Sequence, residues 1–389
     1  MSSCLTCRLF YDHSETINRK GGCYQLKKQE YSPRTDLAIE AKEMFVEENP
    51  DKKHELDGII IKEYEEENIK LTRVEINEQG SERVGKNPGQ YITIESLKLR
   101  ELNQTFENQV ASVLGKEIDR LLKYHEVNEG ARCLVVGLGN SYVTPDALGP
   151  DTVKKAYITS HLFKYHEGVV GEGFRPVSAF NPGVMGLTGM ETSNMINGIV
   201  KELNPDFLIV IDALAARSID RVNTTIQLSD AGIHPGSGVG NDRKEVSEKT
   251  LGVPVFSIGI PTVVDAVTIT SDTIDYLLKH FGRELETGDQ PSKSLVPAGM
   301  SFGEKKQLTD EDLPDEEVRE RFLGVVGMLE IEEKRQLIQE VLRPLGHDLM
   351  VTPKDVDDVI IHMSKIIASG INQGLHQSIT NENASDYIR

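Results

Sequence analysis

Apolar residues recur along this chain in two periods, one typical of helices and one of buried strands. A helical period runs from residue 37 to about residue 48, and a longer one places on one face Phe106, Val110, Val113, Leu114, Ile118, Leu121 and Leu122. Short apolar runs predict strands at 58–62, 70–76, 133–136, 177–180, 207–211 and 253–258. Further helices are expected at 147–165, 188–203, around 269–278, at 330–342 and at 353–371. Strands that alternate with helices predict an α/β fold, a mostly parallel sheet with helices on both faces and additional C-terminal helices.

The ends of the chain and one internal segment depart from this pattern. Residues 1–36 show no sustained period and contain Gly21-Gly22 and Ser32-Pro33, so we interpret them as a leader. Residues 37–376 are expected to form a single domain, with a polar, proline-rich insertion near 285–315. Residues 377–389 are expected to form a flexible tail.

Charge is strongly acidic and unevenly distributed. The 389 residues carry a formal net charge of −19, yet residues 1–36 hold six Lys or Arg against four Asp or Glu. An acidic body repels a phosphate backbone, so direct nucleic-acid binding is not expected. The sequence has neither an apolar run long enough to span a membrane nor a signal-peptide core, which predicts a cytoplasmic protein.

Three cysteines, Cys4, Cys7 and Cys23, lie in the leader, outside any expected core. A disulfide framework is therefore not expected. As metal ligands they would need a fourth partner such as His13, which stands at no recognised spacing. No metal site and no cofactor are predicted.

A glycine pair after the strand at 133–136 invites comparison with dinucleotide-binding loops. Gly137 and Gly139 fit, but Tyr142 occupies the third glycine position and Pro145 interrupts the loop. The fingerprint therefore fails, and the backbone from Gly137 to Asn140 is expected instead to help position a substrate.

Ser301 lies in a Gly-x-Ser-x-Gly pattern, which in serine hydrolases needs a strand before the serine and a helix after it. Pro297 disfavours that strand, so we do not interpret Ser301 as a nucleophile.

Two aspartates are the strongest candidates for chemistry. Asp146 and Asp212 each stand in an Asp-Ala-Leu sequence at an expected strand-to-helix junction. Each alone could cap its helix. Since ligands bind at the carboxyl ends of parallel strands, both side chains are expected to face one crevice. Paired carboxylates can share a proton and perform acid–base hydrolysis, or they can hold a divalent cation, with His234 as a further site residue.

Five long segments together make the chain resemble a known family. They are GLGNSYVTPDALGP (137–150), RPVSAFNPGVMGLTGMETS (175–193), IDALAARSIDRVNTTIQLSDAGIHPGSGVG (211–240), GVPVFSIGIPTVVDAVTI (252–269) and RPLGHDLMVTPKDVD (343–357). Over roughly residues 31–376 the chain resembles the germination protease family of spore-forming bacteria. This resemblance implies an endopeptidase that starts the degradation of small acid-soluble spore proteins, located in the forespore or spore core. It also implies a fold similar to that of hydrogenase maturation proteases.

The resemblance further implies that Asp146 and Asp212 are the catalytic aspartates. It implies a homotetrameric zymogen that removes a prosegment by cutting itself at an acidic residue followed by an apolar residue and Ala. Asp36-Leu37-Ala fits that pattern, so the cut is expected between Asp36 and Leu37. Two other interpretations stay open, namely a metal-dependent hydrolase that uses the same aspartates and a non-enzymatic small-molecule-binding α/β protein.

Overall fold

We describe the protein from a computed structural model. The structure describes residues 35–48, 57–101, 103–165, 170–235, 244–287, 312–329, 331–342 and 349–388. Several predictions concern residues outside these ranges. They are the cysteines of the leader, Ser301, most of the expected insertion and the part of the glycine-rich loop at 236–243.

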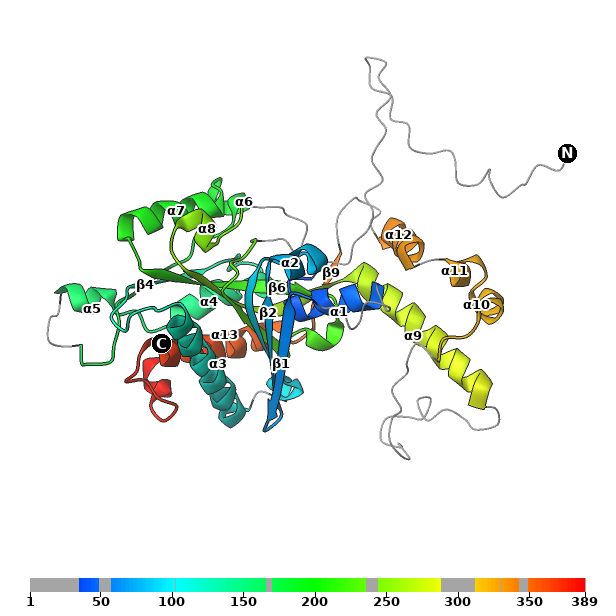
Figure 1. The fold of residues 1–389 in the computed structure, drawn as a ribbon, viewed down its shortest axis with the longest axis horizontal. Helices are drawn as coiled ribbons and strands as arrows, with labels where there is room; N and C mark the ends of the chain where they lie inside the picture. Colours follow the sequence, from blue (N-terminus) through cyan, green and yellow to red (C-terminus); the bar gives the residue numbers. More distant parts are fainter. Residues whose placement is uncertain are drawn as a thin grey trace, which may run out of the picture.

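One mixed sheet forms the centre of the described chain (Figure 1). Its strand order is β1-β2-β3-β7-β8-β6-β4-β5, with β9 paired to β8. The bounds are β1 Ile59–Glu66, β2 Ile69–Ile76, β3 Gly89–Glu95, β4 Cys133–Gly137, β5 Val177–Phe180, β6 Phe207–Ala216, β7 Thr225–Ser229, β8 Val255–Asp265 and β9 Met350–Val351. Strands β8, β6, β4 and β5 run parallel, whereas β1, β2, β3 and β7 extend the sheet with antiparallel pairings. The α/β fold class is thus confirmed, and an antiparallel half continues the predicted parallel sheet.

Helices cover both faces of the sheet. The helices are α1 Ala38–Glu48, α2 Glu78–Val84, α3 Gln104–Tyr124, α4 Leu148–Lys155, α5 Ser160–Tyr165, α6 Met185–Thr188, α7 Thr192–Leu203, α8 Glu248–Leu251, α9 Ala266–Thr287, α10 Glu316–Leu323, α11 Val325–Met328, α12 Ile331–Leu342 and α13 Val356–Leu375. Short 3-10 turns are η3 Leu97–Glu101, η4 Thr144–Asp146, η5 Ile219–Arg221 and η9 Ala384–Tyr387. Figure 1 shows α3 and α13 on one side of the sheet and α7 and α8 on the other.

Strand β6 shows why both faces are covered. Phe207, Ile209 and Ile211 pack into the core beneath α3 and α13, whereas Leu208 and Val210 pack against the α7 side. Successive strand residues point to opposite faces, so a strand buried on both sides has a continuous apolar sequence. The same alternation sends the next residue, Asp212, to the α7 side.

Several expected boundaries were wrong. The helix predicted at 147–165 is two helices, because the chain becomes extended at Ala156 (ψ 149°) before α5 begins. The helix predicted at 188–203 begins only at Thr192, because Gly189, with φ 70°, ends the short helix α6 before it. The last helix starts at Val356 rather than at residue 353.

The residues after His376 do not have the form of a loose tail. Ile379 and Ala384 are buried, and the ring of Tyr387 packs edge-on against that of Tyr157 at 5.0 Å between centroids. Asn372 of α13 also donates a side-chain hydrogen bond to the Tyr387 carbonyl (3.2 Å). The C-terminal segment therefore belongs to the folded body.

Candidate active site

Asp212 lies inside strand β6, not at a strand-to-helix junction. The strand continues to Ala216, and Asp212 pairs in register with Gly259 of β8. Its side chain is 7 % exposed, and the carboxylate accepts a hydrogen bond from the Ala213 N–H (2.9 Å). A role as a helix cap is therefore excluded for Asp212, and a buried carboxylate stands on the α7 side of the sheet.

Asp146 reaches the same region through a loop that folds back on itself after β4. The Leu138 N–H donates to the Ile211 carbonyl (2.8 Å), which keeps the start of the loop beside β6. Farther on, the Asn140 N–H donates to both the carbonyl (3.0 Å) and the carboxylate (2.9 Å) of Asp146. Asp146 ends η4, and the cap residue of α4 is Ala147, so this carboxylate does not cap α4 either.

Glycines make this close folding possible. Gly139 has φ +110°, and a Cβ there would come within 2.0 Å of the Asp146 carbonyl oxygen. At Gly137 a Cβ would come within 2.4 Å of the Gly149 carbonyl oxygen. Because the two glycines have no Cβ, the backbone of the loop can pack closely, and this packing positions Asp146.

Both carboxylates line one cavity of about 640 Å³. Gly139 and His234 line it as well, whereas Gly137 and Asn140 are not among its lining residues. Of the predicted site residues, the structure thus brings Asp146, Asp212, Gly139 and His234 to one space. Two carboxylates that line one cavity can share a proton and perform acid–base hydrolysis of an amide.

Thr35 and Asp36 line the same cavity, and Leu37 follows them into the core. The Asp36 N–H donates to the Ala215 carbonyl (3.0 Å), and the Ala215 N–H donates to the Asp36 carboxylate (2.8 Å). Lys86 donates from Nζ to the Thr35 carbonyl (2.7 Å). The Leu37 side chain is fully buried in a cluster that includes Leu214, Ala216, Val222 and Val264. The structure therefore holds the predicted cleavage segment by main-chain hydrogen bonds and one apolar pocket.

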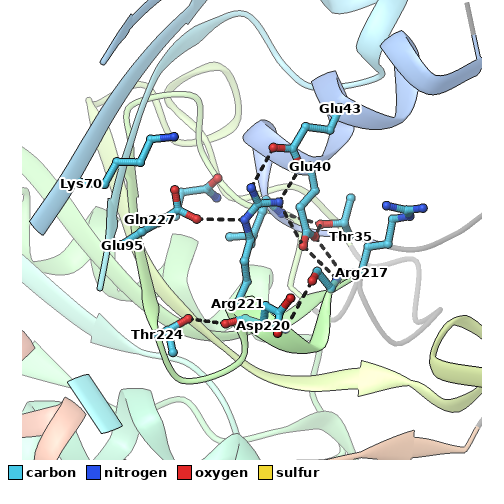
Figure 2. Close-up of polar contacts among 12 residues, drawn as sticks. Thr35, Glu40, Glu43, Lys70, Glu95, Arg217, Asp220, Arg221, Thr224 and Gln227 are labelled. Atoms are coloured by element: carbon cyan, nitrogen blue, oxygen red, sulfur yellow. Dashed lines mark hydrogen bonds and ion pairs between the residues drawn. The ribbon is translucent and has the colours of Figure 1, made fainter. Parts of the chain in front are cut away.

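Helix α1 anchors this segment on its C-terminal side. Glu40 is buried, and its carboxylate accepts hydrogen bonds from the Arg217 N–H (2.7 Å), the Ser218 N–H (2.9 Å) and the Thr35 hydroxyl. Arg221 joins the same anchor through Glu43 and Glu95, as Figure 2 shows. Although burial opposes its charge, the carboxylates of Glu43 and Glu95 raise the pKa of the Arg221 guanidinium.

No pattern in the sequence marks two of the cavity residues, Lys86 and Gln227, as site residues. Lys86 follows α2, and Gln227 lies in the middle of β7. Burial lowers the pKa of Lys86, while the negative charges of Asp36 and Glu40 oppose that shift. Only the long-range pairing of the strands brings these two side chains to the Asp36 segment.

The described residues contain no cluster of three or more His, Cys, Asp or Glu side chains arranged to hold a metal ion. His234 therefore does not complete a ligand set with the two aspartates in this arrangement. Within the same described ranges, no helix is both long and apolar enough to cross a membrane.

Comparison with known proteins supplies the family. The family described as germination protease matches residues 38–388. The germination protease of Priestia megaterium (strain ATCC 12872 / QMB1551) is 56 % identical over 365 residues, which cover 93 % of this chain and 99 % of that protein. The germination protease of Geobacillus sp. (strain WCH70) is 58 % identical over 361 residues, covering 92 % and 97 % respectively.

Among solved structures, the [NiFe] hydrogenase maturation protease HycI from Thermococcus kodakarensis KOD1 shares 17 % sequence identity with this chain. The match covers 34 % of this chain and 74 % of that one, with a TM-score of 0.23. A similarity of this size is too low to support an argument about the fold.

Proposed function

Since this chain belongs to the germination protease family, we propose that it is an aspartic-type endopeptidase whose catalytic pair is Asp146 and Asp212. The observation that carries the proposal is the position of Asp36 in the cavity that the two carboxylates line. The peptide bond between Asp36 and Leu37 then corresponds to the peptide bond of a substrate that the enzyme hydrolyses.

Hydrolysis by this pair needs one shared proton. The ionised carboxylate removes a proton from a water molecule, whose oxygen attacks the carbonyl carbon of the peptide bond. The protonated carboxyl donates its proton to the carbonyl oxygen, which gives a neutral tetrahedral intermediate. Collapse of this intermediate breaks the C–N bond, while the carboxyl that took the proton from water passes it to the leaving nitrogen and one hydroxyl of the intermediate returns its proton to the other carboxylate. The products are a new C-terminal carboxylate on Asp36 and a new N-terminal amine on Leu37.

The contacts of the Asp36 segment support a preference for an acidic residue followed by an apolar one. The Ala215 N–H donates to the Asp36 carboxylate, and Lys86 adds a positive charge nearby. Leu37 fills the apolar pocket, and Ala38 is fully buried in a separate apolar cluster with Tyr91 and Ala231. We infer that substrates bind as extended chains, and small acid-soluble spore proteins are the substrates that the family implies.

We further propose that residues 1–36 are an inhibitory prosegment. Its last residues occupy the place that a substrate would take, and Glu40 and Arg221 hold the chain beyond the cut. A homotetramer located in the spore core is proposed from the family alone.

Intact-mass analysis of the full-length chain after a shift to mildly acidic pH tests the proposal. Wild type, Asp146→Asn and Asp212→Asn are compared with a control, Asp119→Asn, which changes a surface carboxylate on α3 that pairs with Lys123. We expect wild type and the control to acquire a new N-terminus at Leu37, and both cavity variants to remain intact.

Processing of both cavity variants at the wild-type rate would refute the catalytic pair. A parallel incubation with EDTA should leave the wild-type cut unchanged. Loss of the cut with EDTA, and its recovery with one divalent cation, would instead favour the metal-dependent hydrolase.

A further inference from the structure

Gln227 faces the cavity from the antiparallel half of the sheet. Its neighbours Ile226 and Leu228 point into the core beneath α3, so Gln227 points to the opposite face. It pairs in register with Gly259, and Gly259 pairs in turn with Asp212. Residues paired across neighbouring strands share a face, so the three positions form one row across the sheet with Gln227 and Asp212 at its ends.

The Gln227 side chain binds the main chain on both sides of the Asp36–Leu37 bond. Its Nε2 donates to the Asp36 carbonyl oxygen (3.2 Å), and its Oε1 accepts from the Ala38 N–H (2.8 Å). A carbonyl can only accept and an amide N–H can only donate, so these two partners fix the orientation of the side-chain amide. Gln227 is 7 % exposed, and both of its polar ends are used in this contact.

From this geometry we propose that Gln227 is a substrate-binding and catalytic residue of the peptidase, an inference that rests on the function proposed above. Its Nε2 donates to the oxygen of the carbonyl that water attacks, and its Oε1 holds the second N–H after the cut. Negative charge grows on that oxygen as water attacks and before the proton from the aspartate is fully transferred, so a donor already in place stabilises the transition state more than the substrate. The carbonyl oxygen has two lone pairs, so it can accept from Gln227 and from the protonated aspartate together.

Both contacts of Gln227 are to main-chain atoms. The residue therefore takes part equally for every extended peptide, whatever its side chains. Selection of an acidic residue before the cut is left to Ala215 and Lys86, and selection of an apolar residue after it to the pocket around Leu37.

The test measures self-processing of the full-length chain by intact mass across a range of pH. Gln227→Leu removes donor and acceptor, while Gln227→Glu keeps an acceptor for Ala38 and removes the donor when ionised. Gln109→Leu on α3 is the matched control, because that amide binds Glu67 on the surface. We expect Gln227→Leu to process about 100-fold more slowly than wild type at every pH. Gln227→Glu should be as slow at neutral pH and should recover as the introduced carboxyl protonates near pH ~4.3.

Rates are expressed relative to wild type at each pH. The other charged groups of the cavity, Asp36, Lys86, Asp146, Asp212 and His234, are common to all variants, so their titration largely cancels. Thermal melting separates a folding defect from a catalytic one. After prolonged incubation the processed chains are also assayed on a peptide containing TDLAIE, where we expect the fall in kcat to exceed the rise in KM that the loss of two main-chain contacts causes.

Processing of Gln227→Leu within about threefold of wild type would overturn the role of Gln227 and leave the aspartate pair intact. A constant defect of Gln227→Glu at all pH values would also overturn it, because the donor would then be irrelevant. If wild type makes no cut after Asp36, both this inference and the proposed function fail.

Discussion

A single buried histidine, His376, should make this protein less stable in mild acid. The side chain is fully buried after the end of α13, and its Nδ1 accepts a hydrogen bond from the Arg175 N–H (3.2 Å). The rings of Tyr157 and Phe174 pack around it at 5.9 and 5.3 Å between centroids. Burial lowers the pKa of His376 from 6.5 to about 4, partly opposed by a hydrogen bond with the Tyr157 backbone.

The sign and size of the effect follow from this shift. In the unfolded chain His376 takes up a proton near its ordinary pKa. In the folded chain burial opposes this protonation. Its contribution to the unfolding free energy is therefore fully present above pH ~6.5 and is lost as the pH falls toward ~4. At about 1.4 kcal/mol per pKa unit the whole contribution is roughly 3 kcal/mol, of which about 2 kcal/mol is lost by pH ~5.

Urea unfolding at a series of pH values from about 8 to about 5 measures this contribution. The informative variant is His376→Asn, which retains an acceptor near the Arg175 N–H and cannot titrate. The control is His161→Asn, on the exposed part of α5. Wild type and the control should lose about 2 kcal/mol more than His376→Asn between these limits. Parallel pH profiles for wild type and His376→Asn would refute the assignment.

Three further predictions concern the site and its anchor. Gly139→Ala should slow self-processing by about 100-fold with the fold intact, because the new Cβ must displace Asp146; an unchanged intact-mass time course would contradict this. Arg221→Met should lower the unfolding free energy by about 3 kcal/mol in urea, because it leaves the buried Glu40 and the partly exposed Glu43 and Glu95 without their cation. The exposed Arg321→Met should cost less than about 1 kcal/mol. Leu37→Ala should weaken the docking of its segment by about 2–5 kcal/mol, seen as faster tryptic removal of the leader, and equal rates would contradict this.

The sequence predicts the parallel half of the sheet well because its strands are buried on both faces. Strand β6 reads as an unbroken apolar run for this reason. Strand β7 has no such pattern, since Thr225, Gln227 and Ser229 alternate with its two core residues. These three polar residues are buried. Their partners come from distant parts of the chain, so no local pattern identifies β7 as an interior strand.

The prediction that Asp146 and Asp212 line one cavity is confirmed. The expected strand-to-helix junction holds for Asp146, which lies between β4 and α4, and is wrong for Asp212. Asp212 lies within β6, and Asp146 returns through hydrogen bonds from Asn140, with Gly139 allowing the close approach. Local sequence patterns place both residues near strand ends. Those patterns do not show how the loop after β4 folds, and this fold is what brings Asp146 to the cavity that Asp212 lines.

The two halves of the sheet supply different parts of the site. The parallel half positions the carboxylates, Asp212 from β6 and Asp146 from the loop after β4. The antiparallel half supplies Gln227 from β7, and Lys86 comes from the connection between α2 and β3. Strand β8 joins the halves, and its Gly259 lies between Gln227 and Asp212. A shift of register at β8 would therefore separate the residue proposed to bind the peptide bond from the residue proposed to hydrolyse it. A Cβ at Gly259 would come within 2.5 Å of the Leu214 side chain, which packs in the same cluster as Leu37. In the proposed mechanism, strand β8 therefore joins the residue that binds the peptide bond to the residue that hydrolyses it through Gly259, a position where a side chain would clash.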